Sequence, residues 1–221
     1  MLVLPALLLA PSCAAVSAMF PSSADEEASF VQVNDLLSRI ELIHVDCELS
    51  GQSVDASIEA LMTLVGPKFR GDPELGYNDF AMAIEMSEEF ATTLRKNYGP
   101  MQDSAMMMFD QWNTDLEVFS SQTMREHSET RLEASRERYN AIVSSVDPAL
   151  EAFDMFNQVM RDHALYLGND FNADSVAIIE KELRDVQVAA RSLTASLEKA
   201  TVACQEFVRK AALRGPLTRV H

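Results

Sequence analysis

The residues that most suggest chemistry are two histidines and a cysteine in segments with helical periodicity. Glu41 and His44 form a Glu-x-x-His pair, the unit with which ferritin-like bundles bind two metal ions. Such a centre needs a second pair and two further glutamates, but Met160 occupies the matching position before His163. We therefore expect both histidines to pack in the core. The alternative is a metal-binding helical bundle that uses His44, His163, Cys47 and methionines as ligands.

A calcium loop is suggested by residues 170–174, which read Asp-Phe-Asn-Ala-Asp. That loop requires Gly at its sixth position and Glu at its twelfth, where this chain has Ser175 and Lys181. The segment is better explained as the start of a helix with Asn172 as its N-cap, because Asn side chains accept hydrogen bonds from free helix N–H groups.

The cysteines and methionines favour packing over ligand roles. Three cysteines, Cys13, Cys47 and Cys204, are too few and too scattered for a disulfide framework or a zinc site. Cys47 and Cys204 fall at apolar helix positions, where a thiol behaves as a small hydrophobic group. The consecutive residues Met106, Met107 and Met108 point around a helix rather than toward one ion. The sequence therefore predicts no cofactor, no metal site and no catalytic residue.

The charge of the chain limits its partners. Thirty-four acidic and 18 basic residues give a net charge of -16, which opposes binding to nucleic acid phosphates and to anionic membranes over most of the surface. The C-terminus differs, because Arg209, Lys210, Arg214 and Arg219 follow Glu206 with no further acidic residue. The helix dipole favours cations at a helix C-terminus, which alone explains Arg209 and Lys210. The alternative is that all four residues contact a membrane surface, where each basic residue contributes about 1 kcal/mol.

The elements that position these residues are long helices. In the last long segment, about 172–214, apolar residues recur in alternating steps of three and four, which is typical of a helix in a coiled-coil-like bundle. We call such a series a seam. Its members here are Val176, Ile179, Leu183, Val186, Ala190, Leu193, Leu197, Ala200, Cys204, Phe207 and Ala211.

Three earlier segments repeat this pattern. The seam of the first, which we expect to begin near Ala28, is Val33, Leu37, Ile40, His44, Cys47, Gly51, Val54, Ile58, Leu61 and Val65. The second, from Pro73, has Tyr77, Phe80, Ile84, Ser87, Ala91, Leu94, Tyr98, Met101, Ala105, Met108, Trp112 and Phe119. The third, after a turn at 119–122, has Leu132, Ser135, Tyr139, Ile142, Val146, Ala149, Phe153, Phe156, Met160, His163 and Leu167.

Short connections between four such helices predict an all-α, elongated, antiparallel up-down four-helix bundle over residues 29–213. Pro100 and Pro148 lie inside the second and third helices, but the seams keep their phase through both prolines. We therefore expect kinks rather than breaks. The second and third helices are longer than the first, so the hairpin near Ser120 is expected to project beyond the core.

Residues 1–18 are apolar, uncharged and short for a membrane span, as in an export leader. Two cleavage sites compete. One follows Ala18 and would discard Cys13, and the other precedes Cys13, which would then carry a lipid. A polar linker covers residues 19–28, and residues 214–221 form a basic tail that we expect beside the start of the first helix, next to any lipid on Cys13. We expect export to the periplasm or a lipid-anchored place in the cell envelope.

The runs FDQWNTDLEVFSS, SETRLEASRERYNAIV and ALYLGNDFNADSVAIIEKELRDV resemble a bacterial family of exported helical proteins classed only as a domain of unknown function. The resemblance covers roughly residues 36–210 and depends mostly on packing and capping positions such as Phe109, Trp112, Arg138 and Tyr139. It implies export and helical hairpins and assigns no activity. We expect a non-enzymatic structural or interaction module of the cell envelope, which binds an unknown protein partner or a second copy of itself.

Overall fold

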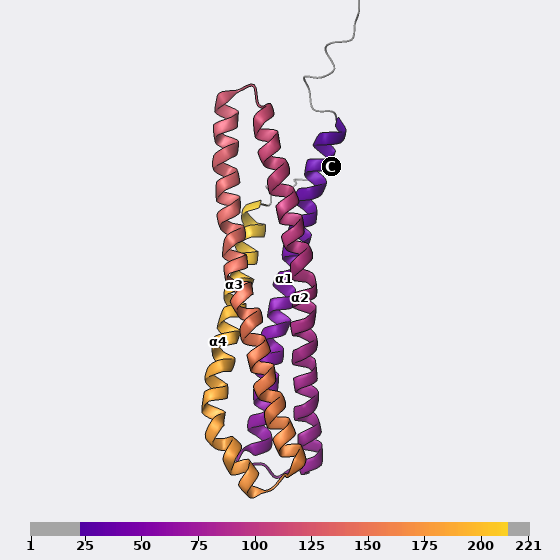
Figure 1. Cartoon of the computed structure of the whole chain (residues 1–221), viewed down its shortest axis with the longest axis vertical. Coiled ribbons are helices and arrows are strands. Elements are labelled where there is room, and N and C mark those ends of the chain that lie inside the picture. Colours follow the sequence, from indigo (N-terminus) through magenta and orange to yellow (C-terminus); the bar gives the residue numbers. More distant parts are fainter. Residues whose placement is uncertain (1–22, 212–221) are drawn as a thin grey trace, which may run out of the picture.

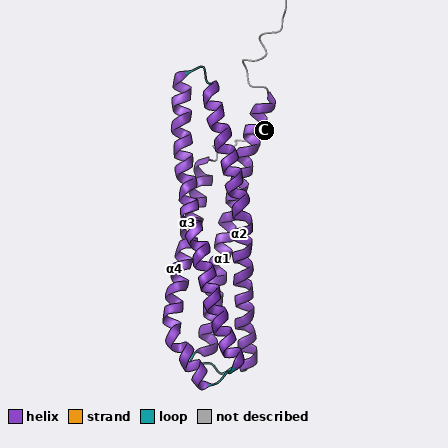
Figure 2. Ribbon diagram, viewed as in Figure 1, coloured by secondary structure: helices purple, strands orange, loops and turns teal. Residues whose placement is uncertain are grey.

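The computed structural model describes residues 23–211, which form four α-helices joined by short loops (Figures 1 and 2). They are α1 (Ser23–Val65), α2 (Pro73–Val118), α3 (Gln122–Asn169) and α4 (Ala173–Ala211). Each helix packs against the next, and α4 packs against α1, so the four form a closed ring of antiparallel neighbours. The predicted all-α up-down bundle is confirmed. The leader 1–18 with Cys13, linker residues 19–22 and the tail with Arg214 and Arg219 lie outside the described residues.

Side chains next to the loops fix where the helices begin. The Asp72 carboxylate accepts hydrogen bonds from the N–H groups of Glu74 and Leu75, and Pro73 occupies the first turn, where its missing N–H costs nothing. Asn172 caps α4 in the same way, through the N–H groups of Asp174 and Ser175. The calcium-like segment 170–174 is thus a helix cap, as predicted.

The core follows the predicted seams of α2, α3 and α4 closely. In α3, ten of the eleven seam residues are buried and Tyr139 is half-buried. In α2 the agreement extends from Phe80 to Met108, but nearer the hairpin Trp112 is half-buried and Phe119 is exposed. The register of three helices is therefore encoded by apolar spacing alone.

The predicted seam of α1 is only partly confirmed. The seam residues that are buried as expected are Ile40, Cys47, Gly51, Val54, Leu61 and Val65, but three of the positions between them shift by one residue. Leu36, Ile43, Ser50 and Ser57 face the core, whereas Leu37, His44 and Ile58 are half-buried. Helix α1 also begins at Ser23 rather than near Ala28. No glycine or proline lies between these two residues to stop the helix.

Both prolines lie inside continuous helices, as the unbroken seams predicted. Each removes one backbone hydrogen bond from its helix, because proline has no N–H. The two sites face each other, since the Tyr98 hydroxyl donates a 2.7 Å hydrogen bond to Asp147, the residue before Pro148. One level of the bundle therefore contains a weakened turn in both α2 and α3.

The hairpin between α2 and α3 extends well beyond the end of α4 (Figure 1). We call the part of α2 and α3 beyond the level of Ala211, together with the hairpin, the arm. At 46 and 48 residues, α2 and α3 are each about 70 Å long, at 1.5 Å per residue. Among residues 23–211, no fourth helix completes the ring at the level of the arm.

Candidate functional site

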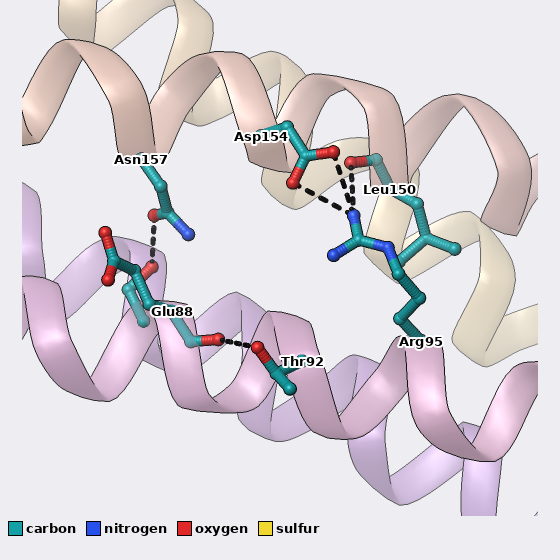
Figure 3. Close-up of polar contacts among 7 residues, drawn as sticks. Glu88, Thr92, Arg95, Leu150, Asp154 and Asn157 are labelled. Carbon is teal, nitrogen blue, oxygen red and sulfur yellow. Dashed lines mark hydrogen bonds and ion pairs between the residues drawn. The ribbon is translucent and has the colours of Figure 1, made fainter.

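The interface between α2 and α3 contains a series of polar contacts (Figure 3). Ser87 donates a 2.8 Å hydrogen bond to the side-chain oxygen of Asn157, and both residues are buried. About two turns further along α2, the Arg95 guanidinium contacts both Asp154 carboxylate oxygens at 3.0 Å and the Leu150 carbonyl at 3.4 Å. These contacts fix the register of α2 against α3, because polar groups at an interface are stable only when they are paired.

Consecutive residues of α2 then join it to both of its neighbours. Asn97 donates a 2.8 Å hydrogen bond to Asp46 of α1, and Tyr98 donates one to Asp147 of α3. Asp46 is only 5% exposed, and burial raises the pKa of its carboxyl group, although the Asn97 hydrogen bond opposes this shift. Burial and the Asp147 carboxylate raise the pKa of Tyr98, which favours the neutral phenol. This polar layer holds α2 between α1 and α3.

Two buried free thiols lie beside the polar layer. Cys47 follows Asp46 on α1, and Cys204 lies on α4. Burial raises the pKa of Cys47, and the nearby Cys204 and Asp46 raise it further. Burial raises the pKa of Cys204 to about 12. The predicted buried thiols are confirmed, and the two residues are close enough to interact electrostatically.

A cavity of about 220 Å³ lies next to Cys204, between α1 and the end of α4. It is lined by Glu41 and His44 of α1 and by Cys204, Gln205, Val208 and Arg209 of α4. The His44 Nε2 atom is 3.7 Å from the Glu48 carboxylate, and its buried Nδ1 atom has no hydrogen-bond partner among the described residues.

The same cavity places the end of α4 beside the middle of α1, so the prediction that it lies beside the start of the first helix is wrong. Glu41 is 18 residues beyond Ser23, a distance of about 27 Å along the helix. Arg209 forms a two-pronged ion pair with Glu206, at 2.7 and 2.8 Å, and both Arg209 and Lys210 are exposed. Two of the four basic residues of the membrane-surface alternative are thus described, and both can be reached by solvent.

The ligands of the metal-binding alternative do not come together. His163 is buried near the other end of the bundle, with Nδ1 at 2.7 Å from the Val159 carbonyl and Nε2 at 3.5 Å from Glu182. Glu182 and Cys204 are 22 positions apart on α4, about 33 Å of helix, so His163 lies far from His44. Among residues 23–211, no group of three or more His, Cys, Asp or Glu side chains could hold a metal ion.

A larger hollow of about 670 Å³ lies on the arm, and we call it the arm groove. Residues from α1, α2, the hairpin and α3 line it, among them Val33, Met108, Trp112, Phe119 and Met124. The Trp112 indole N–H donates a 2.8 Å hydrogen bond to Ser128, which fixes the ring between α2 and α3. Helix α4 contributes nothing to this groove, because it ends below the arm.

The tip of the arm is unusually apolar for a hairpin. Val118 is 62% exposed, Phe119 40% and Met124 63%. Sequence reasoning predicted the projecting hairpin but assigned Trp112 and Phe119 to the core. The sequence did contain a signal for this exposure. The second and third helices are longer than the fourth, so the fourth described helix cannot cover the apolar positions near the hairpin.

None of the four described helices combines the length and hydropathy that a membrane-spanning segment requires. Comparison with curated proteins found no match, and comparison with solved structures found none either. Residues 34–211, most of the chain and nearly the whole described bundle, match a family described as protein of unknown function (DUF2959). This range agrees with the resemblance over residues 36–210. The chain belongs to the DUF2959 family of proteins of unknown function.

Proposed function

We propose that the chain is a non-enzymatic structural or interaction module of the cell envelope, and that its arm groove binds a partner protein. The observation that carries the proposal is an apolar groove built by α1, α2 and α3 at the level where α4 is absent. Exposed apolar surface of this kind commonly marks a protein contact.

The best-fitting partner is an amphipathic helix that takes the position of the missing fourth helix. Helices bind such grooves by inserting apolar side chains spaced three and four residues apart. Trp112 is suited to anchor the contact, because its ring is held by Ser128 and tryptophan is enriched among residues that dominate binding energy. That helix comes from another protein or from a second copy of this chain.

Two observations support a role without catalysis. The pKa values of Cys47, Cys204 and Tyr98 are all raised, which disfavours the ionised nucleophilic forms at neutral pH. Several buried polar groups of α2 and α3 join helices, as in the Ser87–Asn157 and Tyr98–Asp147 hydrogen bonds.

Site-specific photo-crosslinking in cells tests this function. A photoreactive amino acid would replace Met124 in the arm or, as a matched control, Met155 in the body of the same helix. The two side chains are 63% and 66% exposed, so only their location differs. We expect one or a few adducts of defined mass from position 124 and none from position 155. Mass spectrometry of the adduct would identify another protein or a second copy. Absence of adducts at 124, or equal labelling at both positions, would overturn the proposal.

Placement in the envelope is a separate part of the proposal. Residues 1–18 have the composition of an export leader, and Cys13 would carry a lipid if cleavage occurs before it. The exposed Arg209 and Lys210, with Arg214 and Arg219 in the tail, would then add attraction to anionic headgroups. The mass of the mature N-terminus checks the cleavage site. Flotation with anionic vesicles, with and without residues 206–221, checks the basic segment, which is unnecessary if both forms float equally at low salt.

A further inference from the structure

We propose that Cys47 and Cys204 are a site of covalent oxidation, at which a disulfide bond links α1 to α4. The inference is independent of the arm and of its partner. Both side chains are fully packed in the core, at 1% and 0% exposure, and both are free thiols in this structure. They lie on helices that are direct neighbours in the ring.

The register of α1 against α4 places the two cysteines at nearly the same level of the bundle. Gln187 donates a hydrogen bond to the Met62 sulfur at 3.0 Å, and Thr194 donates one to Asp55 at 3.4 Å. Moving seven residues back along α1 therefore corresponds to moving seven residues forward along α4. The same antiparallel pairing, extended further in this direction, places residue 47 of α1 opposite residue 202 of α4. Residue 202 is about 3 Å along the helix axis from Cys204.

Small residues allow the two helices to approach closely at this level. Gly51 lies one turn from Cys47, and a Cβ atom added there would be 3.9 Å from the Thr194 methyl group. Ala200 lies one turn from Cys204 on the core side and is fully buried. Close approach is needed, because a disulfide requires Cα atoms about 4.4–6.8 Å apart. The electrostatic effect of Cys204 on Cys47 agrees with sulfur atoms that face each other.

The cavity beside Cys204 brings an oxidant next to this buried side chain, and local opening at the end of α4 then exposes the sulfur. Cys204 lines this cavity with His44 and Arg209, whereas Cys47 is not among its lining residues. The reaction requires an oxidant, and the chemical class that fits is a disulfide, either a small molecule or a dithiol oxidoreductase. Burial disfavours the Cys204 thiolate, so this step is slow. Once ionised, Cys204 attacks one sulfur of that disulfide and releases the other, which takes up a proton to become a thiol.

Closure of the bond then uses the thiol in the core. The Cys47 thiolate attacks the Cys204 sulfur of the mixed disulfide and releases the second sulfur of the oxidant as a thiol. The two cysteines together lose two electrons and two protons, which the oxidant disulfide gains as it becomes two thiols. The new bond closes a loop from residue 47 to residue 204, so it would strongly restrict the unfolded chain.

The test is peptide mapping of the full-length protein after incubation with oxidised glutathione, alkylation of remaining thiols and digestion with trypsin. Cys47 falls in the peptide 40–68, Cys204 in 200–209 and Cys13 in 1–39, so each linkage has its own mass. We expect the 40–68 and 200–209 peptides to be joined and to separate on reduction. The same treatment of the chain in guanidinium confirms that the reagent oxidises all three thiols.

A second measurement compares thermal unfolding of the oxidised and the reduced protein. Oxidation should raise the unfolding midpoint by roughly 5–15 °C. In the Cys47→Ser and Cys204→Ser variants the midpoint should not respond to oxidation. Alkylated peptides 40–68 and 200–209 after oxidation of the native protein would overturn the proposal, as would linkage of either peptide to Cys13 or a glutathione adduct that never closes. Because mapping uses the unaltered chain, the result stands even if a variant fails to fold.

Discussion

Asp35 and Asp46 lie on the same helix, but their surroundings move their pKa values in opposite directions. Hydrogen bonds from Arg39 and Ser104 lower the pKa of Asp35, because both favour the ionised carboxylate. Burial raises the pKa of Asp46, since a low dielectric environment disfavours charge. The two residues therefore contribute to stability with opposite dependence on pH.

The prediction at this scale concerns Asp46→Asn. A carboxyl group whose folded pKa is raised binds protons more tightly in the folded state, so the wild type should lose free energy of unfolding as pH rises above about 3.8. Asparagine does not titrate, and its amide can still accept a hydrogen bond from Asn97. The free energy of unfolding of Asp46→Asn, measured by urea denaturation, should therefore improve relative to wild type between about pH 3.5 and 7.

Asp35→Asn is the matched control, because its pH dependence should have the reverse sign. The lowered pKa of Asp35 gives stability above about pH 3.8, and this stability disappears as pH falls through the folded pKa. The substitution should cost less than about 1 kcal/mol at pH 7, since the Asp35–Arg39 pair is exposed. This loss of free energy of unfolding should disappear at acidic pH, because Asp35 of the wild type is then protonated as well. If the free energy of unfolding of both variants varies with pH in parallel with that of the wild type, the folded state perturbs the pKa of neither carboxyl group.

Among the helices, α1 shows most clearly where sequence reasoning succeeds and where it stops. Apolar spacing predicted the register of α2, α3 and α4, but in α1 two registers share Ile40, Cys47, Val54 and Leu61. The observed one buries serines, which hydropathy does not predict. Ser53 and Ser57 donate hydrogen bonds to carbonyl groups of their own helix, so these hydroxyls enter the core without an unpaired donor.

The same limit applies to the candidate sites. Sequence reasoning found His44, Cys47, Cys204 and the projecting hairpin, but it could not show which of them meet. Cys47 lies near Cys204 because α1 packs against α4. The apolar spacing within a single helix does not show which other helix is its neighbour. Likewise, the arm groove exists because α4 ends at Ala211, below the hairpin.

A glycine pair gives the prediction at the scale of the helices. Gly51 lies inside α1, and a Cβ atom added there would make an ordinary contact, 3.9 Å from the Thr194 methyl group. Gly51→Ala should therefore raise the free energy of unfolding by about 0.5–1 kcal/mol, because alanine loses less backbone entropy on folding. Chemical denaturation would measure the change.

Gly66→Ala should have the opposite effect. A Cβ atom at this position would lie 2.6 Å from the backbone carbonyl oxygen of Met62, and backbone cannot move aside as a side chain can. We expect destabilisation at the end of α1. If both alanines change stability in the same direction, local contacts do not determine the outcome at these positions.

At the scale of the whole molecule, stability should decrease along the long axis toward the arm. The body has four helices around its core, whereas the arm groove is built without α4. Regions with fewer buried contacts open more readily, so their amides exchange faster. Hydrogen exchange followed by mass spectrometry should show faster exchange at residues 110–130 than at 80–95 or 150–165. Uniform protection along α2 and α3 would contradict this gradient.

The paired proline sites also have a mechanical consequence. A force applied sideways at the tip of the arm is carried toward the base by α2 and α3, and each lacks one backbone hydrogen bond at the level of Tyr98 and Asp147. Asp46 of α1 and Cys204 of α4 lie near this level, so all four helices still brace it. Bending should therefore begin just beyond it, where α2 and α3 continue past the described end of α4, and the two weakened turns make that bending easier.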